Sequence, residues 1–132
     1  MKHSIIFVSV LTCSIALFSC QSVPKDIPED LSARELVQSG QTALDNGNSK
    51  AAEAYYNALL ERYGADPACY AEAKFEIAHL YVKKKNYRVA APLLEEILRL
   101  YQNVPVGTLP PAFGRLAEVD YKKIPDKYKA DL

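Results

Sequence analysis

The chain has 132 residues, 49% of them apolar, and its 16 Lys and Arg residues balance 16 Asp and Glu residues. This length suits one compact domain and excludes a two-domain enzyme or a complete α/β barrel. A net charge of zero gives no argument for nucleic acid, which would need a basic face. The three cysteines, at positions 13, 20 and 69, fit neither a disulfide framework nor a zinc site.

The first 19 residues have the features of a secretory signal peptide. A short basic start precedes an apolar run at residues 5–18, which is 14 residues long. Such a run is too short for the roughly 20 residues of a membrane-spanning helix and matches the apolar region of a signal peptide. The run ends in Leu17-Phe18-Ser19-Cys20, which resembles the lipobox of bacterial lipoproteins.

This resemblance implies that the peptide is cut before Cys20 and that the Cys20 thiol carries diacylglycerol. An ordinary signal peptide cut elsewhere and an uncleaved anchor are the alternatives. Two or more acyl chains hold a protein stably on a membrane, whereas one holds it only marginally. We therefore expect a protein of the bacterial cell envelope, anchored by lipid on its periplasmic or outer face. The sequence does not distinguish the inner membrane from the outer membrane.

Residues 21–30 contain two prolines and no apolar periodicity. Such a segment cannot bury enough surface to fold, so residues 20–30 are predicted to be the lipidated cysteine and a flexible tether. After cleavage and lipidation Cys69 is alone, and no intramolecular disulfide is expected.

From Leu31 onward the apolar residues follow a helical period, and no stretch alternates with the period of a strand. Cap residues divide this part into helices. Ser32 and Glu35 form a capping box, and Asp66 precedes a proline that suits the first helical position. Asn48 and Asn86 are further N-cap candidates. The fold class predicted is all-α.

The helical part contains an internal repeat. A shift of 38 residues aligns five identical pairs: Asn48 with Asn86, Ala52 with Ala90, Leu60 with Leu98, Tyr63 with Tyr101, and Pro67 with Pro105. The repeated unit is a helix, a short turn, a second helix and a longer turn. Repetition at this length indicates a helical solenoid.

Small residues stand where two helices of each unit would cross, namely Gly40 and Ala52 in the first unit and Ala78 and Ala90 in the second. With these residues the chain resembles the tetratricopeptide-repeat family, whose helical hairpins keep small residues at their crossings. The resemblance implies a short helical-hairpin solenoid over residues 31–121. Its units are 33–66 and 71–104, with a capping helix at 110–121 and a tail at 122–132.

The long turn between units resembles the repeats of lipoproteins of outer-membrane assembly. The residues behind this likeness are Arg62-Tyr63-Gly64, Asp66-Pro67 and Lys85-Asn86-Tyr87. Those relatives carry about twice as many repeats, so the likeness does not imply a shared function.

The fifth helix is predicted to cover the second hairpin, because a solenoid of about two and a half units is near the minimum that buries its own core. Phe113, Leu116 and Val119 are expected to provide this cover. Tyr121, Ile124 and Tyr128 are expected to continue it.

In the repeat family the first helix of each unit lines a partner groove. The resemblance places six residues there: Val37, Gln41, Leu44, Phe75, His79 and Val82. Phe75, His79 and Val82 share one helical face in any case, because they lie at i, i+4 and i+7. One interpretation is an apolar groove with a polar handle for a peptide or helix. The other is that the fifth helix covers this face.

The remaining candidates are weaker. His79 has no second ligand three or four residues away, so no metal site is predicted. The lysines at 83–85 could touch acidic phospholipid or an acidic partner, but such a run is more often a solvated helix end. Cys69 lies where a helix N-terminus could lower its pKa, although a small buried residue is the simpler interpretation. No phosphate loop, nucleophile elbow or zinc-protease motif is present.

The sequence therefore favours a protein that is not an enzyme and needs no cofactor. The first hypothesis is a lipid-anchored adaptor that binds another envelope protein. The alternative is a periplasmic carrier of a small apolar ligand or lipid, held between the hairpins and the fifth helix.

The first prediction concerns the anchor. Cells that express the chain should incorporate labelled fatty acid into it, and the Cys20→Ala variant should incorporate none, because no other thiol stands at the end of the apolar run. Equal labelling of both chains, or a mature amino terminus at another residue, would contradict the lipobox interpretation.

Overall fold

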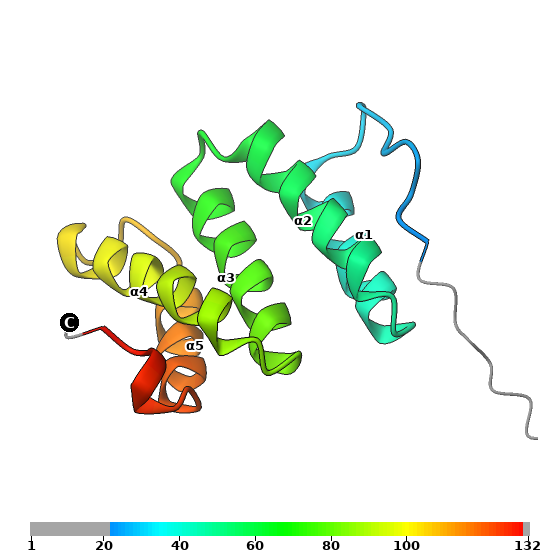
Figure 1. Cartoon of the computed structure of the whole chain (residues 1–132). Coiled ribbons are helices and arrows are strands. Elements are labelled where there is room, and N and C mark those ends of the chain that lie inside the picture. Colours follow the sequence, from blue (N-terminus) through cyan, green and yellow to red (C-terminus); the bar gives the residue numbers. More distant parts are fainter. Residues whose placement is uncertain (1–21, 131–132) are drawn as a thin grey trace, which may run out of the picture.

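The computed structural model describes residues 22–130, and every regular element in that part is helical. The helices are α1 (Ala33–Asp45), α2 (Ser49–Tyr63), α3 (Pro67–Lys83), α4 (Tyr87–Asn103) and α5 (Pro111–Lys122), followed by the short 3-10 helix η1 (Asp126–Tyr128). The all-α class is confirmed (Figure 1). The predicted signal peptide and Cys20 lie outside the described residues. Within residues 22–130 no helix has the length and apolar character to cross a membrane.

The N-cap residues begin the helices as the sequence predicts. The Glu35 backbone N–H donates to Ser32 Oγ at 3.4 Å, and the Ser32 backbone N–H donates to Glu35 Oε2 at 2.8 Å. Asp66 Oδ1 accepts from the backbone of Ala68 and Cys69 at 2.8 and 3.0 Å. These bonds satisfy donors that a helix start leaves unpaired. Asn86 differs, because its side chain makes no capping hydrogen bond.

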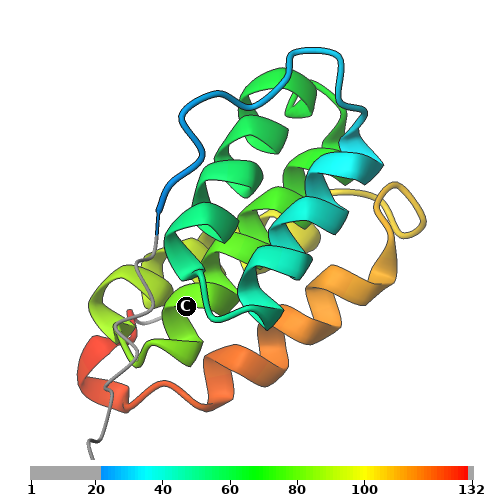
Figure 2. The same ribbon diagram turned by 90° about the vertical axis from the view of Figure 1, so that its right-hand side faces the viewer.

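The helices form a short solenoid in which each one packs on the next. α1 pairs with α2, α2 with α3, α3 with α4, and α5 lies against both α3 and α4. The α1–α2 turn, the α3–α4 turn and the end of α5 lie along the lower edge of the molecule in Figure 1, and the α2–α3 turn lies at the upper edge. Figure 2 shows the first hairpin from its outer side.

The hairpins are held together by large side chains that fit against small ones. Gly40 is buried against Tyr56, and a Cβ atom at Gly40 would lie 2.8 Å from two ring carbons of Tyr56. Ala78 and Leu94 occupy the corresponding positions of the second unit, and both are fully buried in one cluster. A small residue lets the two helix backbones approach closely.

The face of α5 that covers the second hairpin differs from the prediction. Leu116 and Val119 are 45% and 50% exposed, so they do not provide the cover. Phe113 packs on the hairpin as predicted, and Gly114 and Ala117 take the place of Leu116 and Val119. The physical reason is the same close approach: Gly114 is buried against the Tyr101 ring, which leaves no room for a larger residue there.

The tail continues the cover as predicted for Ile124, Tyr121 and Tyr128. Ile124 is buried in the core of the second hairpin, and the two tyrosines pack against that core.

The segment before α1 also differs from the prediction of a loose tether. Arg62 on α2 donates from Nη1 to the Pro28 carbonyl at 2.6 Å and from Nη2 to the Ile27 carbonyl at 2.9 Å. Asn48 donates from Nδ2 to the Ser22 carbonyl at 2.9 Å. Ile27 also packs against the core of the first hairpin. The segment from Ser22 onward is therefore fastened along the α1–α2 hairpin.

The second prediction tests the Gly40 crossing. Replacing glycine by alanine inside a helix normally stabilises it by about 1 kcal/mol. Gly40→Ala should instead lower the free energy of unfolding by about 1–3 kcal/mol, because the new methyl group overlaps the buried Tyr56 ring. Urea unfolding followed by circular dichroism measures this change.

A double variant gives the matched control. Gly40→Ala with Tyr56→Leu recreates the Ala78 and Leu94 pair of the second unit, so it should recover much of the lost stability relative to Gly40→Ala alone. Arg34→Ala, at an exposed position of α1, should change the stability by less than about 0.5 kcal/mol. A stabilising Gly40→Ala would contradict the crossing.

Candidate partner-binding face

The six residues predicted to line a groove do not share one environment. On α1, Gln41 is exposed. Val37 is half-buried against the core of the first hairpin, and Leu44 is half-buried against the core between α2 and α3. On α3, Phe75 and Val82 are only 5% and 8% exposed. His79, the sixth residue, is half-buried.

α5 covers the apolar face of α3. The Phe75 ring stacks on the His79 ring with centroids 5.6 Å apart, and the Phe113 ring of α5 lies 5.9 Å from Phe75. Val82 belongs to the same buried cluster as Ala117. Of the two interpretations that the sequence left open, the structure therefore places Phe75 and Val82 in a covered core and not in an open groove.

His79 joins α3 to α5. Its Nδ1 lies 2.5 Å from Oδ2 of Asp120, a residue that is only 2% exposed. The other Asp120 oxygen accepts from Lys123 Nζ at 2.6 Å. A buried carboxylate is costly unless it is paired, so His79 and Lys123 stabilise the position of Asp120. The sequence could not reveal this contact, because 41 residues separate its partners.

Polar side chains of α1 and α3 lie close to Glu76, and we call this group the polar strip. It consists of Gln41, Glu72, Glu76 and His79. The side chains of Gln41 and Tyr56 lie close enough to Glu76 to favour its charged form. Burial raises the pKa of Glu76 above its usual range despite the nearby His79, and burial also raises the pKa of Glu72.

The polar strip is suited to accept hydrogen bonds and positive charge. A half-buried carboxylate has lost part of its hydration, so a cation or a backbone N–H from a partner restores favourable contacts. Within residues 22–130 neither Glu72 nor Glu76 forms an ion pair with a lysine or arginine of this chain. Nothing in the sequence distinguishes the two carboxylates from an ordinary surface pair on a helix. Their i, i+4 spacing on the same helix as His79 was the available signal.

The remaining candidates give no chemical centre among residues 22–130. No group of three or more His, Cys, Asp or Glu side chains there is arranged to hold a metal ion. Burial, with a smaller contribution from the Asp66 carboxylate, raises the pKa of the Cys69 thiol. This direction is opposite to the one that makes a cysteine reactive.

Between α3 and α5 the space expected for an apolar ligand is filled by side chains, including Phe75 and Phe113. An open hollow of about 240 Å³ remains between α4 and α5, beside Tyr101 and Gly114. A cavity of about 410 Å³ lies elsewhere, on the first hairpin beneath the amino-terminal segment. Its lining includes Ser22, Pro24, Thr42, Asn46 and Tyr55. The surface of this cavity is more apolar than polar, but the cavity is wide open and lies away from the place expected for the carrier's ligand.

Comparison with known proteins agrees with the architecture. The family model described as tetratricopeptide repeat matches residues 36–66 and 71–104, which are the two hairpins. The chain is 33% identical over 110 residues to an uncharacterized protein of Treponema pallidum (strain Nichols). That match covers 82% of this chain and 44% of the relative, so the chain spans less than half of the relative's length. No solved structure gives a significant match.

The third prediction tests the cover over α3. Phe75→Ala should lower the free energy of unfolding by about 3–5 kcal/mol, because it removes a buried ring between His79 and Phe113. The matched variant Leu116→Ala removes an apolar side chain from the exposed face of α5 and should cost less than about 1 kcal/mol. Urea unfolding of both variants decides the question. If Phe75→Ala lowers the free energy of unfolding by less than about 1 kcal/mol, the Phe75 side chain lies at an open surface.

Proposed function

We propose that this tetratricopeptide-repeat-like protein is a lipid-anchored adaptor of the bacterial cell envelope, which binds another protein through the polar strip and has no catalytic role. Tetratricopeptide repeats suggest protein–protein interaction, and the family model matches both hairpins. The observation that carries the finer proposal is the pair of half-buried carboxylates at Glu72 and Glu76, which no lysine or arginine within residues 22–130 neutralises.

The chemistry of the strip suggests the kind of partner segment. Its carboxylates favour a segment that presents lysine, arginine or free backbone N–H groups. Gln41 supplies an amide that both donates and accepts, next to Glu76. The apolar anchor that the sequence suggested on α3 is not available, because α5 covers Phe75 and Val82. Recognition would therefore depend on polar contacts more than on an apolar groove.

The membrane attachment rests on Cys20, two residues before the first described residue. The apolar run that ends at the lipobox-like sequence supports this part of the proposal. The proposal that the chain has no catalytic role rests on the sequence, which contains no phosphate loop, nucleophile elbow or zinc-protease motif.

The fourth prediction tests the partner face. A photoreactive amino acid at Gln41 of the full chain should give a discrete crosslinked product in cells, and mass spectrometry should identify the same partner in repeated experiments. Glu72→Gln with Glu76→Gln should lower the yield of that product about fivefold, which corresponds to roughly 1 kcal/mol of lost charge pairing.

Two control positions make this experiment selective. The photoreactive residue at Asn57, which is exposed on α2, should not give the product, and Glu61→Gln should leave its yield unchanged. The same products from positions 41 and 57 would contradict the partner face. A small apolar compound that stabilises the isolated protein, without any protein product, would favour the carrier hypothesis instead.

A further inference from the structure

Half of the positive charge of this neutral chain lies in two short segments. Residues 83–88 and 120–129 contain eight of the 16 Lys and Arg residues but only two of the 16 Asp and Glu residues. We call their cationic side chains the basic edge. They are Lys83, Lys84, Lys85, Arg88, Lys122, Lys123, Lys127 and Lys129.

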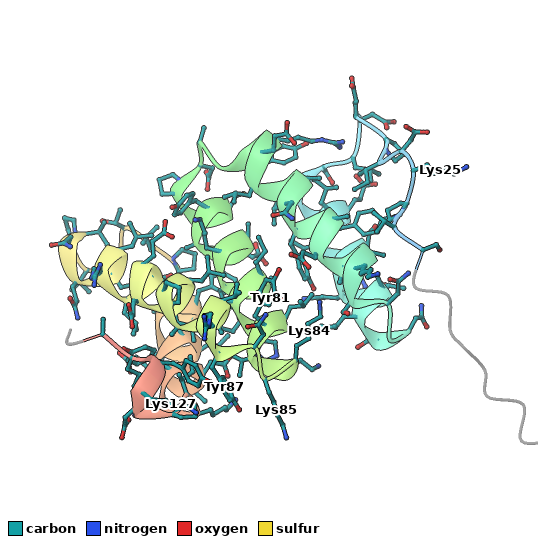
Figure 3. The ribbon with its side chains drawn as sticks, viewed as in Figure 1. Lys25, Tyr81, Lys84, Lys85, Tyr87 and Lys127 are labelled. Atoms are coloured by element: carbon teal, nitrogen blue, oxygen red, sulfur yellow. The ribbon has the colours of Figure 1, made fainter. Side chains whose placement is uncertain are left out.

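The fold brings the two segments of the basic edge together. The Tyr87 ring at the start of α4 lies 6.0 Å from the Tyr128 ring of η1. Lys127 Nζ lies 5.0 Å from the centre of the Tyr128 ring. Figure 3 shows Lys85, Tyr87 and Lys127 near one another at the lower edge of the molecule, with Lys85 directed away from the helices. One continuous surface therefore combines lysines from the α3–α4 turn with lysines from the tail.

Most of this charge is not neutralised by the chain itself. Within residues 22–130, Lys83, Lys85 and Lys122 are exposed and form no ion pair. The acidic residues of the segments are already paired, Asp120 with Lys123 and Asp126 with Lys129. Cations at the ends of α3 and α5 also suit the helix dipole, but the dipole does not explain the lysines of η1 and the tail.

The amino-terminal segment leaves the domain at the same edge. Asn48, in the α1–α2 turn, holds the Ser22 carbonyl. The α1–α2 and α3–α4 turns lie along one edge of the solenoid (Figure 1). Cys20 precedes Ser22 by two residues, which is at most about 7 Å of extended chain. A lipid on Cys20 would therefore enter the membrane beside the edge that carries the free lysines.

We propose that the basic edge lies on an anionic phospholipid surface and orients the domain on the membrane. The geometry of this proposal rests on the proposed lipid anchor, because the anchor selects which edge meets the membrane. Lysine and arginine side chains near an anionic lipid surface each strengthen binding, about fivefold per residue. A lipid anchor and a basic surface are two signals that together give stable attachment.

The test uses the full chain with Cys20→Ser, so that its result does not depend on lipidation. This chain is floated with vesicles of phosphatidylcholine alone and with vesicles that contain about one third phosphatidylglycerol. Removing three unpaired charges, by Lys83→Gln, Lys85→Gln and Lys122→Gln, should weaken binding to the anionic vesicles by up to about 100-fold. Binding to the neutral vesicles should not change, and raising the salt concentration should reduce only the binding to anionic vesicles.

A second triple variant controls for net charge. Lys25→Gln, Arg34→Gln and Arg99→Gln remove the same charge from exposed positions outside the basic edge, and this variant should bind the anionic vesicles like the parent chain. The amino-terminal apolar run is the same in every chain, so only the differences between chains are compared.

The proposal is overturned if the Lys83, Lys85 and Lys122 variant binds the anionic vesicles as the parent chain does, or if both triple variants lose binding equally. The proposal is also overturned if the Lys83, Lys85 and Lys122 variant binds vesicles normally but no longer gives the crosslinked product with the photoreactive residue at position 41. The basic edge would then bind an acidic protein surface and not a membrane. If no crosslinked partner is found but vesicle binding still depends on these charges, the adaptor proposal is contradicted. The proposal that the basic edge binds an anionic membrane is then still supported.

Discussion

The close approach of helix backbones at small residues is the constraint on which the rest of this structure depends. Gly40 faces Tyr56 in the first hairpin, Ala78 lies with Leu94 in the core of the second, and Gly114 lets α5 rest against Tyr101. At each crossing a large side chain needs a partner with little or no bulk beyond the backbone. The Tyr101 hydroxyl also donates to the Pro110 carbonyl at 2.6 Å, which fixes the start of α5. The packing of Gly114 on the Tyr101 ring and this hydrogen bond together determine the position of α5.

The position of α5 decides which surfaces remain for binding. Because α5 lies close to α3, it buries Phe75 and Val82 and brings Asp120 to His79. The apolar face that would otherwise be a groove becomes part of the core, as a solenoid of so few units requires. The side chains of α1 and α3 around Glu76 are polar, and the half-buried carboxylates of Glu72 and Glu76 distinguish this polar strip from an ordinary solvated surface. The same packing that stabilises the domain thus changes the chemistry of its partner face.

The features that the sequence predicted well are local ones. Helix starts at Ser32 and Asp66 depend on residues within one turn, and the 38-residue repeat identifies the crossings by their small residues. The covering face of α5 was not predictable in the same way, because Leu116 and Val119 are more apolar than Gly114, which makes the contact. The hydrophobicity of a side chain predicts how strongly it favours burial. The space available at a crossing depends instead on the side chains of both helices. The bond between His79 and Asp120 and the fastening of residues 27 and 28 by Arg62 have no local signal at all.

The net charge of the sequence likewise does not predict the charge of any one surface of the fold. A net charge of zero describes the sum over the chain, but a partner or a membrane meets only one surface at a time, and screening confines each charge to about 10 Å. The solenoid places the α1–α2 and α3–α4 turns on one edge. Lysines that are distant in sequence, at 83–85 and 122–129, therefore add to one another there. Acidic residues such as Glu61 and Asp66 lie near the α2–α3 turn, on the opposite edge (Figure 1). The alternation of helix direction in the repeat therefore gathers lysines from two segments of a neutral sequence on one edge. Such an uneven distribution of charge gives the domain a preferred orientation next to a charged surface.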